Sequence, residues 1–152
     1  SDRFQVHGKA DRIDRLNDGR MVIYDYKTGQ PPTPKQIRAY QKQLLVEAVM
    51  LEGRGFENIA SDPVAFVEYI GLSRSSKPQR VDLVDDGEDD NQTVTIQREL
   101  IDLFSEYHTA EKGYPSRRAM ESVRWGGDYD HLARFGEWDD TEPPTLIRLP
   151  EC

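Results

Sequence analysis

Hydrophobic and polar residues alternate over the first part of the chain in a pattern that predicts two β-strands joined by a tight turn. The first strand is expected over residues 4–15 and the second over residues 21–28. Between them, Asn17, Asp18 and Gly19 are residue types that accept the positive φ angles of a hairpin turn. The two strands are therefore expected to pair antiparallel.

A helix start follows the second strand. Thr33 suits the N-cap position, Pro34 the first helical position, and Gln36 completes the spacing of a capping box. Apolar residues then recur at helical intervals until two glycines end the pattern. The apolar positions are Ile37, Tyr40, Leu44, Ala48 and Leu51, and the glycines are Gly53 and Gly55. One helix is therefore expected over residues 34–51.

The second half of the chain predicts two more strands and a second helix. Residues 64–70 are apolar on both faces, which is typical of a central strand, and residues 79–84 suit an edge strand. Apolar residues from Ile96 to Tyr107 mark an amphipathic helix that Gly113 is expected to end. The predicted fold class is α/β, with a mixed central sheet flanked by helices in the order ββαββα.

After residue 113 the pattern weakens. The remaining aromatic residues lie among glycine, aspartate and arginine: Trp125, Tyr129, Phe135 and Trp138. Asp128, Asp130 and His131 are metal-ligand types, but their spacing fixes no geometry. We therefore expect residues 1–113 to form the core and residues 114–152 to form an irregular C-terminal tail that packs on the core or on a neighbouring domain.

Composition narrows the class of protein. The chain has 152 residues, which suits one domain, and a net charge of −8, which counts against binding of nucleic acid by this chain alone. An acidic domain that acts on nucleic acid would need a basic surface from elsewhere, so we expect a piece of a larger protein. The single cysteine, Cys152, excludes a cysteine-ligated zinc or iron–sulfur site. No apolar run is long enough to span a membrane, and a cytoplasmic location is expected.

The hairpin carries the candidate chemistry. Residues two apart in a strand point to the same face, so Asp25 and Lys27 project together, and the turn can bring Asp11 close to Asp25. Two carboxylates can hold a divalent cation, and a lysine beside them can orient a water and offset charge on phosphorus. This set is sufficient for metal-dependent hydrolysis of a phosphodiester. The competing interpretation is an ordinary surface ion pair, because a D-x-K triplet often occurs by chance.

Neighbouring residues leave further alternatives open. Asp14 is the rival ligand to Asp11, but strand parity places it on the opposite face, where it suits a pair with Arg12 or Arg15. His7 and Lys9 share the face of Asp11 and are candidate contacts for metal or DNA, although a structural histidine and a solvated lysine are equally consistent with the pattern. Gln43 and Glu47 lie one helical turn apart, so both are near-site residues if that side of the helix faces the hairpin.

Three motifs together resemble a known family. They are Gly8-Lys9-Ala10-Asp11, then Asp25-Tyr26-Lys27-Thr28-Gly29, then Gln43-Leu44 on the following helix. In order and spacing they resemble the RecB-like branch of the PD-(D/E)XK nucleases, and more closely the C-terminal nuclease domain of AddB-type subunits of bacterial helicase–nucleases. The resemblance implies a restriction-endonuclease-like fold. The helix that usually precedes the first strand in this family is expected to be missing.

The resemblance also implies roles for individual residues. Asp11, Asp25 and the carbonyl of Tyr26 would be metal ligands, Lys27 the catalytic lysine, and Gln43 a residue beside the active site. The expected cofactor is Mg²⁺, with Mn²⁺ able to substitute, and no iron–sulfur cluster. Expected partners are a DNA single strand delivered by a helicase, an AddA-like subunit and the remainder of the parent chain, acting as an exonuclease in double-strand break repair. One departure is Glu47, which stands where the family often has an aromatic residue.

A second class of function remains open. The same fold could serve as a catalytically silent scaffold or interaction module in a larger DNA-processing complex. The acidic charge and the aromatic tail favour that alternative.

Overall fold

The computed structural model describes residues 4–83, 92–109 and 111–113 together with His131, Leu132, Arg134, Glu137 and Thr145. The chain divides into two compact units, residues 1–104 and residues 105–152. In the second unit the described contacts are local, such as the ion pairs Lys112–Glu106 and Arg134–Glu137. Nearly all of the predicted tail lies outside the described residues, so its packing stays a prediction.

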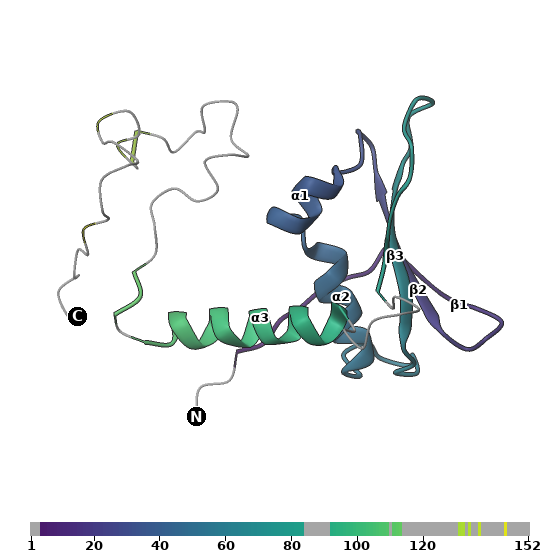
Figure 1. Ribbon diagram of the computed structural model, residues 1–152, viewed down its shortest axis with the longest axis horizontal. Coiled ribbons are helices and arrows are strands. Elements are labelled where there is room, and N and C mark those ends of the chain that lie inside the picture. Colours follow the sequence, from purple (N-terminus) through teal and green to yellow (C-terminus); the bar gives the residue numbers. More distant parts are fainter. Residues whose placement is uncertain are drawn as a thin grey trace. The chain divides into compact units, whose positions relative to one another are not determined.

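The first unit contains a four-stranded mixed sheet (Figure 1). Its strands are β1 (Arg12–Arg15), β2 (Met21–Lys27), β3 (Val64–Gly71) and β4 (Gln79–Asp82), in that spatial order. The β1–β2 and β3–β4 pairs are antiparallel, and the two inner strands are parallel. The central position predicted for residues 64–70 and the edge position predicted for the strand that begins at Gln79 are both confirmed.

The predicted hairpin is present, but its first strand is shorter than expected. The amide of Leu16 donates to the carbonyl of Arg20 at 2.8 Å, and Gly19 has a φ of 92°, which favours glycine. Regular pairing starts only at Arg12, because the amide of Tyr26 donates to the side chain of Asp11 instead of to a backbone carbonyl. The prediction of a strand from residue 4 is therefore wrong.

Residues 4–10 cross the helical side of the sheet instead. Phe4 stacks on Phe104 of the last helix with ring centroids 5.0 Å apart. At Gly8 an added Cβ would lie 3.5 Å from Met50, so the backbone runs closely against the second helix there. The described residues of this segment, 4–10, contain no helix.

Two helices replace the single helix predicted for residues 34–51. The capping box of Thr33 and Gln36 is confirmed and begins α1 (Pro34–Ala39), and α2 spans Gln43–Glu52. Between them the buried hydroxyl of Tyr69 donates to the carbonyl of Gln41 at 3.0 Å and accepts from the amide of Leu44 at 3.4 Å. A side chain inserted between helical backbone groups is an established cause of such a break.

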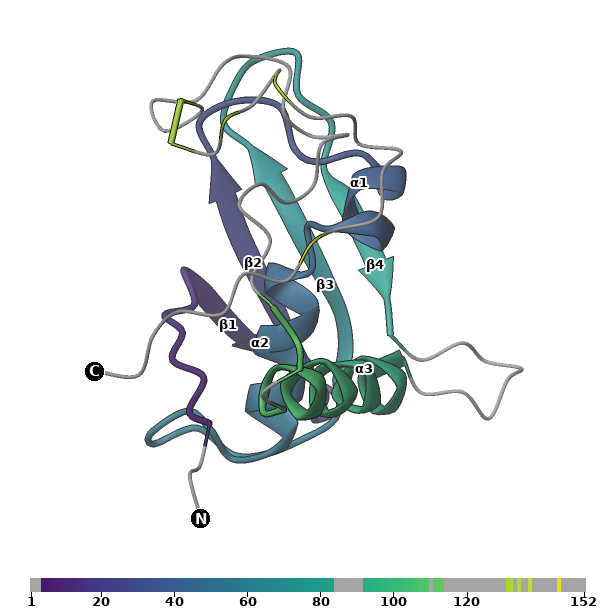
Figure 2. The same ribbon diagram turned by 90° about the vertical axis from the view of Figure 1, so that its left-hand side faces the viewer.

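All three helices lie on one face of the sheet, as the two perpendicular ribbon views show (Figures 1 and 2). The last helix, α3 (Gln92–Tyr107), confirms the predicted amphipathic element but ends six residues before Gly113. Glu52 joins the layers, because it accepts from the amide of Val64 at 2.8 Å and from the hydroxyl of Thr93 at 2.7 Å. None of the helices in the described part of the chain combines the length and apolar character that a membrane crossing requires.

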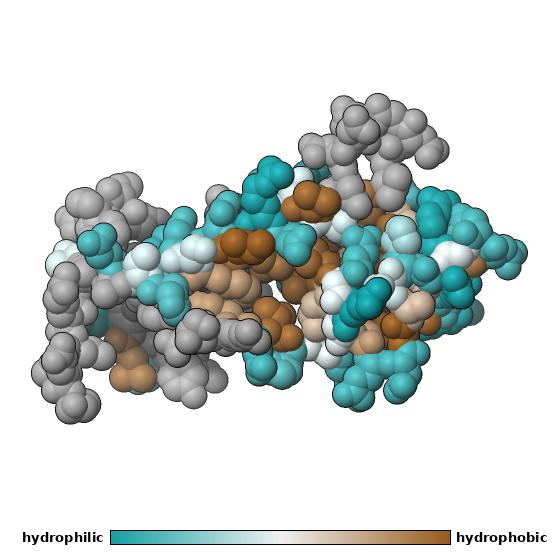
Figure 3. Space-filling model, turned by 90° about the horizontal axis from the view of Figure 1, so that it is seen from below, coloured by the Kyte–Doolittle hydropathy of each residue, from teal (hydrophilic) through white to brown (hydrophobic). Residues whose placement is uncertain are grey.

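The core lies between β2, β3 and α2. Its fully buried side chains include Ile23, Leu44, Leu51, Val67 and Tyr69. Seen from the side on which α3 lies, apolar side chains also reach the surface (Figure 3). Phe4 and Ile101 are among the exposed large hydrophobic residues of the described chain, with exposed fractions of 53% and 56%.

The inserted tyrosine hydroxyl predicts a measurable loss of stability when it is removed. Tyr69→Phe leaves the ring in the core but deprives the helix break of two hydrogen bonds, so the free energy of unfolding is expected to fall by about 1–2 kcal/mol. Urea unfolding measures the change. Tyr24→Phe is the control, because it removes a hydroxyl from the opposite face of the same sheet. Equal stability of the Tyr69 variant and the wild type would contradict the proposed cause of the break.

Candidate active site

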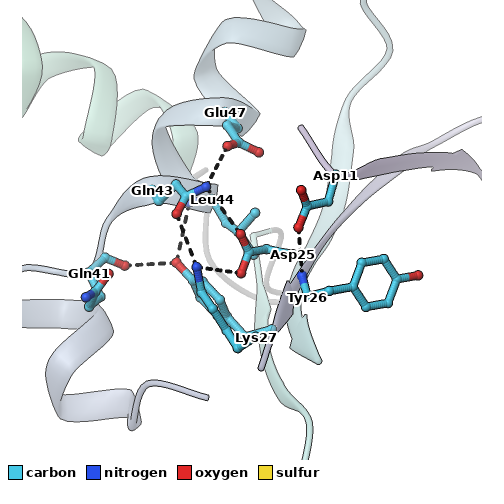
Figure 4. Close-up of polar contacts among 9 residues, drawn as sticks. Asp11, Asp25, Tyr26, Lys27, Gln41, Gln43, Leu44 and Glu47 are labelled. Atoms are coloured by element: carbon cyan, nitrogen blue, oxygen red, sulfur yellow. Dashed lines mark hydrogen bonds and ion pairs between the residues drawn. The ribbon is translucent and has the colours of Figure 1, made fainter. Parts of the chain in front are cut away.

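Strand β2 and the residue just before β1 bring Asp11, Asp25 and Lys27 together (Figure 4). Asp25 and Lys27 lie on β2, near the end of the strand, on the face that α2 covers. Asp11 directly precedes β1, and its Oδ2 accepts from the amide of Tyr26, the residue after Asp25, so that the close-up shows the two carboxylates near each other (Figure 4). The convergence predicted from strand parity is therefore confirmed.

Asp25 is the buried centre of the group. Its residue is 5% exposed, and the Nζ of Lys27 lies 2.8 Å from its Oδ2. This buried oxygen therefore has the ammonium beside it as charge compensation and no other partner among the described residues. The second oxygen, Oδ1, accepts from the side-chain amide of Gln43 at 3.2 Å.

Gln43 connects Asp25, Lys27 and Glu47. Its Nε2 donates to Oδ1 of Asp25 and to Oε1 of Glu47, the latter at 3.1 Å, and its Oε1 accepts from the Nζ of Lys27 at 3.4 Å. This pattern fixes the orientation of the amide, because both N–H groups meet carboxylates and the carbonyl meets the ammonium. The side of α2 that carries Gln43 and Glu47 therefore faces the hairpin, and the alternative of a plain helix surface is wrong.

Glu47 is more deeply buried than a glutamate normally is. The residue is 4% exposed, and its Oε2 is buried without a hydrogen-bond partner. Burial raises the pKa of Glu47, the hydrogen bond from Gln43 opposes that rise, and the charges of Asp25 and Asp11 add to it. Three carboxylates therefore share one electrostatic environment with a single ammonium.

Asp11 lies at the open side of the group. It is exposed, and its Oδ2 accepts from the amide of Tyr26 at 2.9 Å. The ring of Tyr26 points away from the acids (Figure 4), as strand alternation requires. Only the backbone of Tyr26 is therefore near the site, and the use of its carbonyl as a metal ligand stays a prediction.

Lys27 is held by its neighbours on β3. Its carbonyl accepts from the amide of Leu72 at 2.9 Å, and its Nζ lies 5.8 Å from the ring centroid of Tyr69. Opposite Lys27 in the register is Gly71, where an added Cβ would lie 2.4 Å from the side chain of Ser76, so only glycine fits. The sequence analysis did not identify Tyr69 as a neighbour of the site. The available signal was its position in an apolar strand, two residues before Gly71.

The remaining candidates lie outside this group. His7 and Lys9 are exposed and precede the regular part of β1, so the parity that placed them on the face of Asp11 does not apply to them. Asp14 forms an ion pair with Arg12 at 2.6 Å, as predicted, on the face of the sheet away from the helices. The structure therefore separates Asp14 from the other acids.

Sequence comparison now assigns the family. A sequence model described as the PD-(D/E)XK nuclease superfamily matches residues 2–121. The chain belongs to the PD-(D/E)XK nuclease superfamily. Its mixed sheet with covering helices is the restriction-endonuclease-like fold of that superfamily, whose members are generally nucleases and typically use divalent metals.

Two relatives are uncharacterized proteins of Rickettsia. The protein of Rickettsia felis is 36% identical over 74 residues, which are 48% of this chain and 8% of the relative. The protein of Rickettsia conorii is 42% identical over 53 residues, which are 34% of this chain and 6% of the relative. The match therefore spans less than a tenth of either relative. No solved structure matches the chain.

The chemistry of the PD-(D/E)XK site suits a hard divalent cation. All its acidic ligand atoms are carboxylate oxygens, the type that Mg²⁺ and Mn²⁺ prefer. Two of them, Oδ2 of Asp25 and Oε2 of Glu47, are buried without a hydrogen bond. Among the described residues, no three His, Cys, Asp or Glu side chains already form a closed ligand set. In the type of their donor atoms, the residues present fit a hard divalent cation.

The raised pKa of Glu47 predicts that the free energy of unfolding depends on pH. The folded protein holds this proton more tightly than the unfolded chain, so the free energy of unfolding falls as pH rises from the ordinary value of 4.5 through the folded pKa. Glu47→Gln has no carboxyl to titrate, so this decrease does not occur in the variant. Between pH 4.5 and the folded pKa, the unfolding free energy of the variant minus that of the wild type is expected to rise by at most about 1.4 kcal/mol per pH unit. Urea unfolding at several pH values in the presence of EDTA tests the difference. A constant difference at all pH values would show that the carboxyl does not titrate there.

Proposed function

We propose that this chain is the nuclease domain of an AddB-like helicase–nuclease subunit and hydrolyses DNA phosphodiester bonds with the help of Mg²⁺. The observation that carries the proposal is the contact of Asp25 with Lys27 at 2.8 Å, beside Asp11 and bridged by Gln43. On an ordinary protein surface, acids are scattered and ion pairs form independently of one another. A single amide, that of Gln43, contacting both Asp25 and Lys27 is not expected there.

Each residue has a distinct task in the proposed reaction. Asp11, Asp25 and the carbonyl of Tyr26 would hold the cation, which supplies polarisation of the phosphoryl oxygen and a lowered pKa of water. Lys27 has a side chain that is 33% exposed, so its ammonium can meet a substrate phosphate and offset the charge that develops on it. Gln43 positions Asp25 and Lys27 relative to each other through its two bonds.

The proposed substrate is a DNA single strand delivered by a helicase. The net charge of −8 means that this chain offers little general attraction for a polyanion, so basic surface from an AddA-like partner and from the rest of the parent protein would have to hold the strand. The Rickettsia relatives are several times longer than the matched segment, which fits a domain within a large bacterial protein. By resemblance, the activity is exonucleolytic and serves double-strand break repair in the cytoplasm.

Substitution of the acid or the lysine is expected to abolish cleavage. Asp25→Asn and Lys27→Met should each lower metal-dependent degradation of labelled single-stranded DNA by about 10²-fold or more, because the first weakens the hold on the cation and the second removes the ammonium beside the reacting phosphate. The assay uses the complete natural protein with Mg²⁺ or Mn²⁺. Asp14→Asn is the matched control, since it removes a carboxylate three residues from Asp11 but on the opposite face, and cleavage should stay near the wild-type rate.

Two outcomes would contradict the assignment. Normal degradation by the folded Asp25 and Lys27 variants would remove these residues from catalysis. Folded wild-type protein that binds no divalent cation would favour the alternative of a silent interaction module.

The bridging amide predicts a separate effect on turnover. Gln43→Met keeps the length of the side chain but releases Lys27 and Asp25 from each other, so kcat is expected to fall by about 10-fold or more while KM changes little. Steady-state kinetics on a short DNA strand measure both constants. A rise in KM with unchanged kcat would mean that Gln43 binds substrate rather than positioning the lysine.

A further inference from the structure

We propose that Glu47 completes the cation site as a third carboxylate, with its Oε2 turned toward the hydration shell of the ion that Asp11 and Asp25 hold. The proposal rests on the proposed function and adds a residue that the family resemblance does not supply, since an aromatic side chain often occupies this position there.

The burial of Glu47 is the first argument. A charged carboxylate that is 4% exposed and has one oxygen without any hydrogen bond is costly to the fold. Glu52, on the same helix, is an example of a carboxylate with a structural role. Both oxygens of Glu52 accept hydrogen bonds, from the amide of Val64 and from the hydroxyl of Thr93. Glu47 lacks that compensation on Oε2, so the atom is available to a ligand.

The direction of the side chain is the second argument. Gln43 engages Oε1 of Glu47, which leaves Oε2 on the side of the acids, and the close-up shows the carboxylate between Gln43 and Asp11 (Figure 4). At Gly8 an added Cβ would lie 4.0 Å from Cγ of Glu47, so the segment before β1 runs alongside the same side chain. The unpartnered oxygen therefore faces the group of acids and is closed off from bulk water.

The type of ligand follows from charge and spacing. Asp11, Asp25 and Glu47 influence one another electrostatically, and Lys27 is the one ammonium among them, so a cation would relieve the excess negative charge. Among the described residues, no group of three such side chains is arranged to hold a metal ion directly. Mg²⁺ commonly keeps several of its waters in proteins. Glu47 accordingly accepts a hydrogen bond from one of these waters instead of binding the ion directly.

Calorimetric titration of the chain with Mn²⁺ tests this role without measuring cleavage. Glu47→Gln keeps the shape and the Gln43 contact but removes the charge, and the dissociation constant is expected to rise about 10-fold, as is common when a group behind the direct ligands is lost. Glu68→Gln is the matched control, because it removes one half-buried glutamate charge from the opposite face of β3, and its affinity should equal that of the wild type. Asp25→Asn should lose binding altogether.

Each outcome separates the two proposals. Affinity of the Glu47 variant within twofold of the wild type, with binding lost in the Asp25 variant, would overturn the role of Glu47 and leave the proposed function standing. No saturable binding by the folded wild type would overturn both. Urea unfolding verifies that each variant folds, and Mn²⁺ should raise the unfolding free energy of the wild type more than that of the Glu47 variant. Should Glu47→Gln fail to fold, Glu47→Met, which has nearly the same volume, replaces it under the same criteria.

Discussion

A buried carboxylate at Asp25 is the constraint on which the rest of the site depends. Removing a charge from water is costly unless opposite charge and hydrogen bonds replace the water. Here the compensation comes from two elements: the ammonium of Lys27 on the same strand at 2.8 Å and the amide of Gln43 on α2 at 3.2 Å. The compensation of Asp25 therefore depends on the position of α2 against β2 as well as on the strand itself.

The break between α1 and α2 serves this arrangement. Gln43 is the first residue of α2, and the hydroxyl of Tyr69 occupies the backbone groups on either side of it, at Gln41 and Leu44. Tyr69 also pairs with Asp25 in the β2–β3 register, and burial raises the pKa of its hydroxyl to about 12. A neutral hydroxyl at this point can donate and accept at once, so one side chain ties the start of the helix to the strand that carries the buried acid.

The sequence predicted most of the sheet and the central residues, but not the elements that long-range contacts decide. Strand parity was sufficient for Asp25, Lys27 and Asp11, because the turn at Gly19 sets the register of the two strands. It failed for residues 4–10, where the side chain of Asp11 takes the amide of Tyr26 and ends the ladder. It also failed at the helix break, since the apolar spacing continues through it and only a tyrosine distant in sequence interrupts the backbone. Glu47 points toward the acids because of how α2 packs on the sheet, and the spacing of apolar residues in the sequence does not predict that packing.

Under the proposed function, the charge of the site would set the order in which the cation and the substrate bind. With Glu47 ionised, three carboxylates face one ammonium, and a phosphate diester approaching them would be repelled. Under the proposed function, the cation would therefore have to bind before the substrate or together with it, because its charge would reverse the sign of the local field. Beyond the site, the net charge of −8 could not be reversed in this way, so under the proposed function the attraction for DNA would have to come from surfaces outside this chain. A domain with these properties would remain inactive toward free nucleic acid until a basic partner presents the strand, which would confine cleavage to DNA already held by the larger assembly.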